Sequence, residues 1–137
     1  MPAMAVEERP RTVPSAEVFL AESVMDGLAD LGDRALAEGR NQEGVLLGTF
    51  YHDSRGSYAV ITDFRSGSDP AGAVGRYRAE PRSGCAPAAA DLLTQEKLFG
   101  QTKSYLMVLT GSDSSFIVIK AEDGVLRPAK FVLDEGQ

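Results

Sequence analysis

The sequence has a single cysteine, a single histidine and no tryptophan. One cysteine cannot form an internal disulfide, and one histidine cannot rebuild a zinc site that needs two. His52 is predicted in an exposed hairpin turn, and Cys85 in a loop as a small thiol without a nucleophilic role. No apolar run approaches the ~20 residues of a transmembrane helix, and residues 1–14 lack the apolar core of a secretory signal. We therefore expect a cytoplasmic protein without cofactor or metal.

Basic residues are outnumbered by acidic ones. Fourteen Lys+Arg against twenty Asp+Glu give a net charge of 14 − 20 = −6. Binding to nucleic acid and to anionic membrane surfaces depends on Lys and Arg, so we expect neither. The Ala, Gly and Arg usage is typical of a GC-rich bacterial genome. With 137 residues, 43% of them hydrophobic, the chain fits one globular domain.

Three prolines and mixed charge without a period predict a disordered tail over residues 1–14, followed by a single domain over residues 15–137. Helical spacing of apolar residues predicts a helix over Val24–Glu38, with Ser23 as its N-cap and Gly39 after its end. Helix formers predict a second helix over Ala88–Phe99, with Leu92, Leu93, Glu96 and Phe99 on one buried face.

Apolar and β-branched runs predict the strands. They are expected over Val18–Leu20, Val45–Tyr51, Tyr58–Phe64, Ala73–Ala79, Tyr105–Thr110 and Phe116–Lys120, with a last strand or pair of strands over Val125–Leu133. Pro128 indicates an edge or a break in the last of these. The order of elements predicts an α+β (mixed α/β) domain, with one central sheet flanked by two main helices.

Three motifs occur in a recognisable order: Gly44-Val-Leu-Leu-Gly48, Gly75-Arg-Tyr-Arg-Ala-Glu-Pro81 and Asp91-Leu92. With these motifs the chain resembles the JAMM/MPN domain (also called JAB or Mov34), a family of zinc-dependent isopeptidases that remove ubiquitin-like modifiers. The resemblance spans roughly Val18 to Leu133 and implies an MPN-like central sheet.

The resemblance also implies where catalytic residues would stand. Active members have a glutamate base, two zinc-binding histidines, a serine and a zinc-binding aspartate at positions that hold Asn41, Arg78, Glu80, Ala88 and Asp91 here. Only Asp91 is retained, and Arg78 puts a permanent positive charge where zinc would sit. The resemblance thus implies a pseudoenzyme, a noncatalytic scaffold that binds a protein partner or forms a homodimer.

The residues leave several roles open for a candidate pocket of Arg76, Arg78, Glu80 and Asp91. Arg78 between two carboxylates predicts a structural ion-pair cluster that replaces the metal. Arg76 and Arg78 share one face of a strand, as an anion site requires, with Arg82 nearby. A hydrolase that uses Glu80 and Asp91 as paired carboxylates, or a small-ligand or peptide site in the vacated pocket, are the alternatives.

Overall fold

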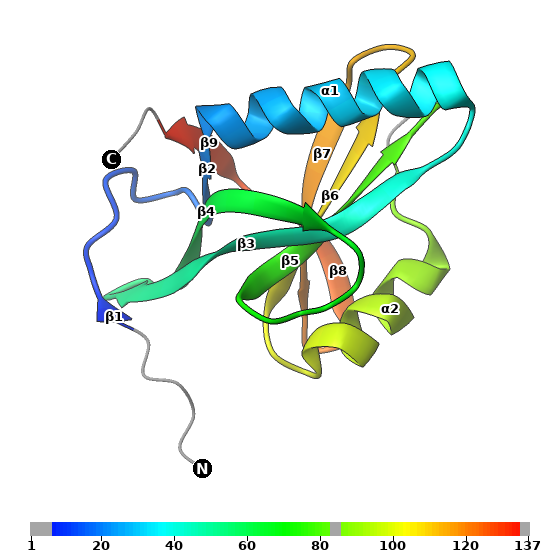
Figure 1. Cartoon of the computed structure of the whole chain (residues 1–137). Coiled ribbons are helices and arrows are strands. Elements are labelled where there is room, and N and C mark those ends of the chain that lie inside the picture. The colour runs from blue at the N-terminus through cyan, green and yellow to red at the C-terminus, as the bar shows by residue number, and fades with distance from the viewer. Residues whose placement is uncertain (1–6, 83–85, 135–137) are drawn as a thin grey trace.

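The fold is one curled sheet with a helix on each side (Figure 1). It is seen in a computed structural model that describes residues 7–82 and 86–134. In chain order the elements are β1 (Glu7–Glu8), β2 (Val18–Ala21), α1 (Glu22–Glu38), β3 (Gln42–Asp53), β4 (Gly56–Ser66), β5 (Ala73–Glu80), α2 (Ala89–Phe99), β6 (Ser104–Thr110), β7 (Phe116–Glu122), β8 (Val125–Pro128) and β9 (Phe131–Asp134).

The strands lie in the order β8-β7-β6-β5-β3-β4-β2-β9, and β1 adds to the free part of β3. β3 and β4 form a long antiparallel hairpin, while β5 and β6 run parallel and are joined through α2. The pairing of β3 shifts register near Leu47 on both of its sides. Such irregularities increase local twist and bend a sheet, which contributes to the curl.

The curl brings the two ends of the sheet together. β8 lies at one end and β9 at the other, yet only Ala129 and Lys130 separate them in the chain. The amide of Ala129 donates to Val118 on one side, while the carbonyl of Lys130 accepts from Glu17 and Val18 on the other. The curled sheet is therefore partly closed by its last strands.

The predicted fold class is wrong in its balance of elements. The sequence predicts an α+β domain of MPN type, whereas the residues that the structure describes form a nine-stranded sheet with two helices. The strands outweigh the helices because β3 and β4 extend well past their apolar centres, to Asp53 and Ser66, and residues 125–134 add the pair β8 and β9. No helix among the described residues is long and apolar enough to cross a membrane.

α1 covers one face of the sheet and closes the main core. Its buried residues are Val24, Leu28, Gly32 and Ala35, which pack over β5, β6 and the neighbouring strands. At Gly111 the approach is so close that an added Cβ would collide with the carbonyl of Gly32.

Both predicted ends of α1 can be compared with the structure. Gly39 ends the helix with a positive φ of 68°, as the sequence predicts. The predicted N-cap is wrong, because the helix begins at Glu22 after Ala21 and no side chain caps it. Ser23 lies instead inside the first turn.

Candidate functional site

The outer face of β5 carries a buried cluster of charged residues. Alternation along the strand puts Arg76, Arg78 and Glu80 on the side that α2 covers, and Asp91 reaches them from the first turn of α2. The Nη2 atom of Arg76 lies 2.6 Å from Oδ1 of Asp91, and Nε of Arg78 lies 2.6 Å from Oε2 of Glu80. Arg78 also donates to both oxygens of Asp91. The ion pairs predicted for Arg78 are therefore present.

Gln95 completes what we call the buried cluster, namely Arg76, Arg78, Glu80, Asp91 and Gln95. Its Oε1 accepts from Nε of Arg76 at 2.6 Å, and its Nε2 donates to Oγ of Ser104 at 2.9 Å. Asp91 and Gln95 are the buried residues of α2. The predicted buried face of this helix is wrong, because Leu93, which was expected on it, is 70% exposed.

The electrostatics of the buried cluster keep Asp91 ionised. Burial alone would raise the pKa of Asp91, but hydrogen bonds from Arg78, the Ala88 amide and Arg76 lower it below its usual value. The pKa of Arg78 is raised, because its bonds to Asp91 and Glu80 outweigh the effect of burial. A catalytic carboxylate pair needs one group with a raised pKa, and Asp91, with its lowered pKa, is not that group.

The other sequence-predicted positions do not converge on this cluster. Asn41 precedes β3 and is exposed, Ala88 is the exposed N-cap residue of α2, and Arg82 is exposed after β5. Glu43 lies opposite Arg78 in the β3–β5 register but is also exposed. Cys85 lies outside the described residues. Within residues 7–82 and 86–134, no group of His, Cys, Asp and Glu side chains is suited to hold a metal ion.

A second charged site lies where residues 7–16 pass over the end of the β3–β4 hairpin. The structure thus holds residues 7–14 of the predicted tail against the domain. We call residues 7–16 the N-terminal strap. Glu7 and Glu8 pair with Tyr51 and His52 of β3, and the carbonyl of Arg9 accepts a 2.7 Å bond from the Tyr58 hydroxyl.

Arg11 fastens the strap to the hairpin turn. Its Nε and Nη2 donate to the two carboxylate oxygens of Asp53 at 2.7 and 2.8 Å, a bidentate geometry. Nη1 and Nη2 also donate to the carbonyls of Ala16 and Gly56. The bonds from Arg11 hold the pKa of Asp53 well below its usual range. The guanidinium of Arg11 thus has its charge and most of its donors satisfied internally.

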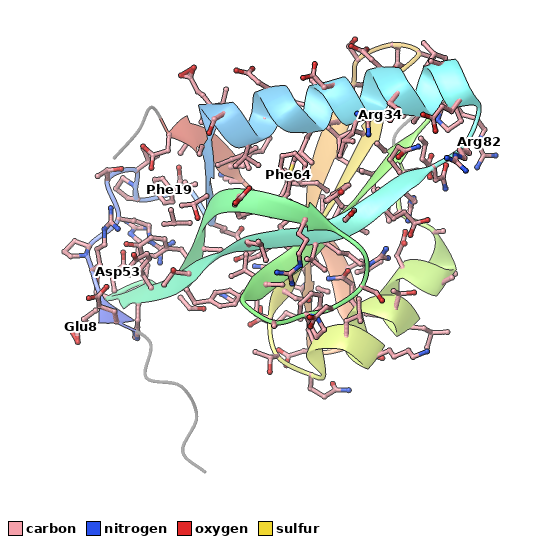
Figure 2. The ribbon with its side chains drawn as sticks, viewed as in Figure 1. Glu8, Phe19, Arg34, Asp53, Phe64 and Arg82 are labelled. Carbon is pink, nitrogen blue, oxygen red and sulfur yellow. The ribbon has the colours of Figure 1, made fainter. Side chains whose placement is uncertain are left out.

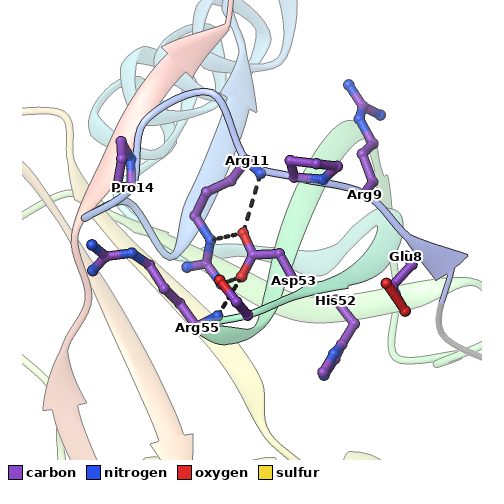
Figure 3. Close-up of a pocket in the computed structure, with 9 residues that line it drawn as sticks. Glu8, Arg9, Arg11, Pro14, His52, Asp53 and Arg55 are labelled. Carbon is purple, nitrogen blue, oxygen red and sulfur yellow. Dashed lines mark hydrogen bonds and ion pairs between the residues drawn. The ribbon is translucent and has the colours of Figure 1, made fainter.

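Beside the strap lies a hollow of about 450 Å³, which we call the strap depression (Figure 3). It is lined by Glu8, Arg9, Pro10, Arg11, Pro14, His52, Asp53, Ser54 and Arg55. Figure 3 shows Arg9 and Arg55 at opposite sides of the Arg11–Asp53 pair, with their guanidinium groups pointing away from each other. Neither of these two forms an ion pair with a described carboxylate within 4 Å.

An aromatic cluster packs beside the strap, outside the lining of the strap depression. The Tyr58 ring contacts those of Phe19 and Tyr51, with ring centroids 5.4 and 5.8 Å apart. The guanidinium of Arg9 lies 4.7 Å from the centre of the Tyr51 ring, and that of Arg11 lies 4.6 Å from the Tyr58 ring. Cation–π contacts of this kind orient an arginine, and the guanidinium keeps its positive charge.

The two charged sites lie on different elements, the buried cluster on β5 and α2 and the second site on the strap and the β3–β4 hairpin. Figure 2 shows Glu8 and Asp53 at the opposite end of the molecule from Arg82, which follows β5. Sequence reasoning found the first site, although it missed Gln95, whose position four residues after Asp91 places both on one helix face. It missed the second entirely, because 42 residues separate Arg11 from Asp53 and no local pattern links them.

Comparisons with known proteins give a fold and no family. No family model matches the sequence, and no curated protein is significantly similar to it. Among solved structures, the solution structure of protein DSY2949 from Desulfitobacterium hafniense is similar, with a TM-score of 0.61 and 12% sequence identity. The match covers 86% of this chain and 93% of that one. At this identity it shows the shared fold alone.

The predicted membership in the JAMM/MPN family is therefore wrong, as are the keywords that follow from it. It has no support from a family model or from a named relative, and the fold is mainly strand. The glycines that suggested it have reasons in this sheet. An added Cβ at Gly44 would collide with the Arg65 carbonyl and the Tyr77 ring, and one at Gly75 with the Tyr105 carbonyl. Close strand packing alone requires these motif glycines.

Proposed function

We propose that this chain is a noncatalytic protein-binding domain and that the strap depression receives the partner. One observation carries the proposal. This hollow of about 450 Å³ is lined by charged side chains, and two of them, Arg9 and Arg55, form no ion pair with a described carboxylate. Arg9 also lies over the ring of the half-buried Tyr51, and Tyr and Arg are enriched in recognition sites.

The noncatalytic part of the proposal rests on the buried cluster. Asp91 and Glu80 both contact Arg78, and Asp91 has a lowered pKa. Asp91 is thereby unsuited to act as a general acid near neutral pH, and Glu80 is engaged in an ion pair with Arg78. His52 is exposed on β3, without the enclosed setting in which catalytic histidines operate. A measurement of metal content after exposure to zinc tests this part, and about one tightly held zinc per chain would contradict it.

The partner in this proposal is a protein and not a nucleic acid, because the chain carries a net charge of −6 and would repel phosphates. It is a second subunit or a second copy of this chain. The cytoplasm is the proposed location, which a single cysteine suits. Sedimentation over a range of concentrations distinguishes self-association from a monomer that needs another partner.

Chemical-shift mapping on the ¹⁵N-labelled full chain tests the binding site. Three ten-residue peptides are used, with the repeats Glu-Ser, Gln-Ser and Lys-Ser. We expect at least one of them to shift the amide signals of residues 8–11 and 52–55 selectively. Failure of all three at millimolar concentration, or shifts confined to another part of the molecule, would overturn the strap depression as the binding site.

A further inference from the structure

The local charge of the strap depression opposes that of the whole chain. Three arginines and two carboxylates line it, Arg9, Arg11 and Arg55 against Glu8 and Asp53, so its charge is 3 − 2 = +1 with His52 neutral. The whole chain carries −6. Opposite local potential guides association with a ligand of complementary charge. An anionic group thus meets attraction here although the remaining surface repels it.

The charges in the strap depression are separated by a neutral pair. Asp53 neutralises Arg11 at the centre, so the available cations are Arg9 on one side and Arg55 on the other (Figure 3). Divergent guanidinium groups cannot converge on one small anion, which needs donors aimed at a single point. They suit instead a chain with carboxylates spaced along it.

Resting on the proposed binding function, we propose that the strap depression selects an extended acidic peptide segment. One carboxylate of the segment pairs with Arg9, which its contact with Tyr51 holds in place, and a second pairs with Arg55. The Arg11–Asp53 pair between them keeps the strap in position and contributes no selectivity. Glu8 also lines the strap depression, and its carboxylate opposes the incoming acidic segment, so it weakens the affinity.

The test compares binding of the Glu-Ser, Gln-Ser and Lys-Ser decapeptides to the full chain by calorimetry and shift mapping. The variant Arg9→Ala with Arg55→Ala removes both available cations but leaves Arg11 and the backbone carbonyl of Arg9, so the strap stays in place. The matched control is Arg34→Ala with Arg127→Ala, which removes the same charge from exposed positions on α1 and β8.

We expect the Glu-Ser peptide to bind tightest and to lose affinity when NaCl is raised from about 50 to about 500 mM, because salt screens exposed charges. Arg9→Ala with Arg55→Ala should weaken it about tenfold, from the loss of two charge-assisted contacts, whereas the control pair should retain nearly full affinity. Glu8→Gln should strengthen it about two- to threefold, the size of one exposed charge interaction.

The outcomes separate this proposal from the more general one. Equal binding of all three peptides at residues 8–11 and 52–55, or equal losses in the two double variants, would overturn selection of acidic segments and leave the binding site itself intact. Absence of binding by every peptide would overturn both.

Discussion

The two helices attach to the same sheet by different physical means. α1 buries Leu28 and three other residues with small or apolar side chains, and it packs backbone against backbone where Gly32 meets Gly111. α2 buries Asp91 and Gln95 and leaves Leu93 exposed. One face of the sheet is a conventional hydrophobic core, whereas at the centre of the other face α2 is held by an ion-pair network.

The two modes of attachment position the helices with different precision. Apolar contacts depend on area and tolerate small shifts, while the bonds of Asp91 to Arg76 and Arg78 fix the direction of α2 as well as its distance. Buried ion pairs recover their desolvation cost only with good geometry. The attachment of α2 should therefore be sensitive to single polar substitutions and insensitive to apolar ones.

Asp91→Ala should have the largest effect. It leaves Arg76 and Arg78 without their shared carboxylate in a buried site, and removal of one partner from such a group costs about 3–5 kcal/mol of unfolding free energy. Urea denaturation measures the loss, with Asp30→Ala on the exposed face of α1 as control. A loss below about 1 kcal/mol would mean that the cluster does not hold α2.

Leu28→Ala tests the opposite face. Leu28 is fully buried, so the substitution should cost about 2–5 kcal/mol through lost burial and a residual cavity. Leu36→Ala, at a position that is 48% exposed, is the control. Equal losses in these two variants would show that α1 is not attached by its apolar face.

Acidification should weaken the α2 side selectively. The pKa of Asp91 is lowered in the folded chain, so its stabilising contribution is present above the unfolded pKa of about 3.9 and is lost as the pH falls toward the folded value. Denaturation midpoints between about pH 5 and pH 2 measure the loss. Asp91→Asn should flatten that dependence, and an unchanged slope in this variant would assign the acid sensitivity to other carboxylates, such as Asp53.

Gln95→Ala should have a moderate effect of about 1–3 kcal/mol. It removes the acceptor of the Arg76 Nε–H and leaves that buried donor without a partner. Gln95→Glu restores an acceptor, at the cost of an additional buried charge beside Asp91. Thermal melts of both variants test whether the amide is needed for its hydrogen bonds. If it is, both variants melt at a lower temperature than the unchanged chain.

Leu93→Ser should have the smallest effect. Its side chain is 70% exposed, so we expect a change within about 0.5 kcal/mol, as for other surface substitutions. A higher solubility or a changed oligomeric state of the Leu93→Ser variant, compared with the unchanged chain, would indicate a protein contact at this helix face. A loss above about 2 kcal/mol would contradict the polar attachment of α2.

Local patterns in the sequence were sufficient for most element positions. The spacing from Val24 to Ala35 predicts α1, and the alternation of Arg76, Arg78 and Glu80 places them on one face, where the structure has their ion pairs. The buried face of α2 was misassigned because burial was inferred from apolarity. Asp91 and Gln95, at helical spacing opposite two arginines, override that rule.

Long-range features were beyond the reach of the sequence. The bonds of Arg11 to Asp53 join residues far apart in the chain, and the pairing of β9 with β2 gives no local signal. The fold class and the family resemblance failed for a related reason. Glycine is required wherever strands and rings pack as closely as they do at Gly44 and Gly75. The spacing of these glycines therefore indicates tight packing and not a particular family.

The pairing of β2 with β9 has a consequence for synthesis of the protein. Val18 pairs with Phe131, and because 131 − 18 = 113 positions separate them, the contact forms only after residue 131 has left the ribosome. Until then the emerging chain presents β2 with one edge uncovered, and uncovered edges attract other strands. Contacts at such separation also slow folding. A premature stop before residue 125 should therefore yield a product that aggregates.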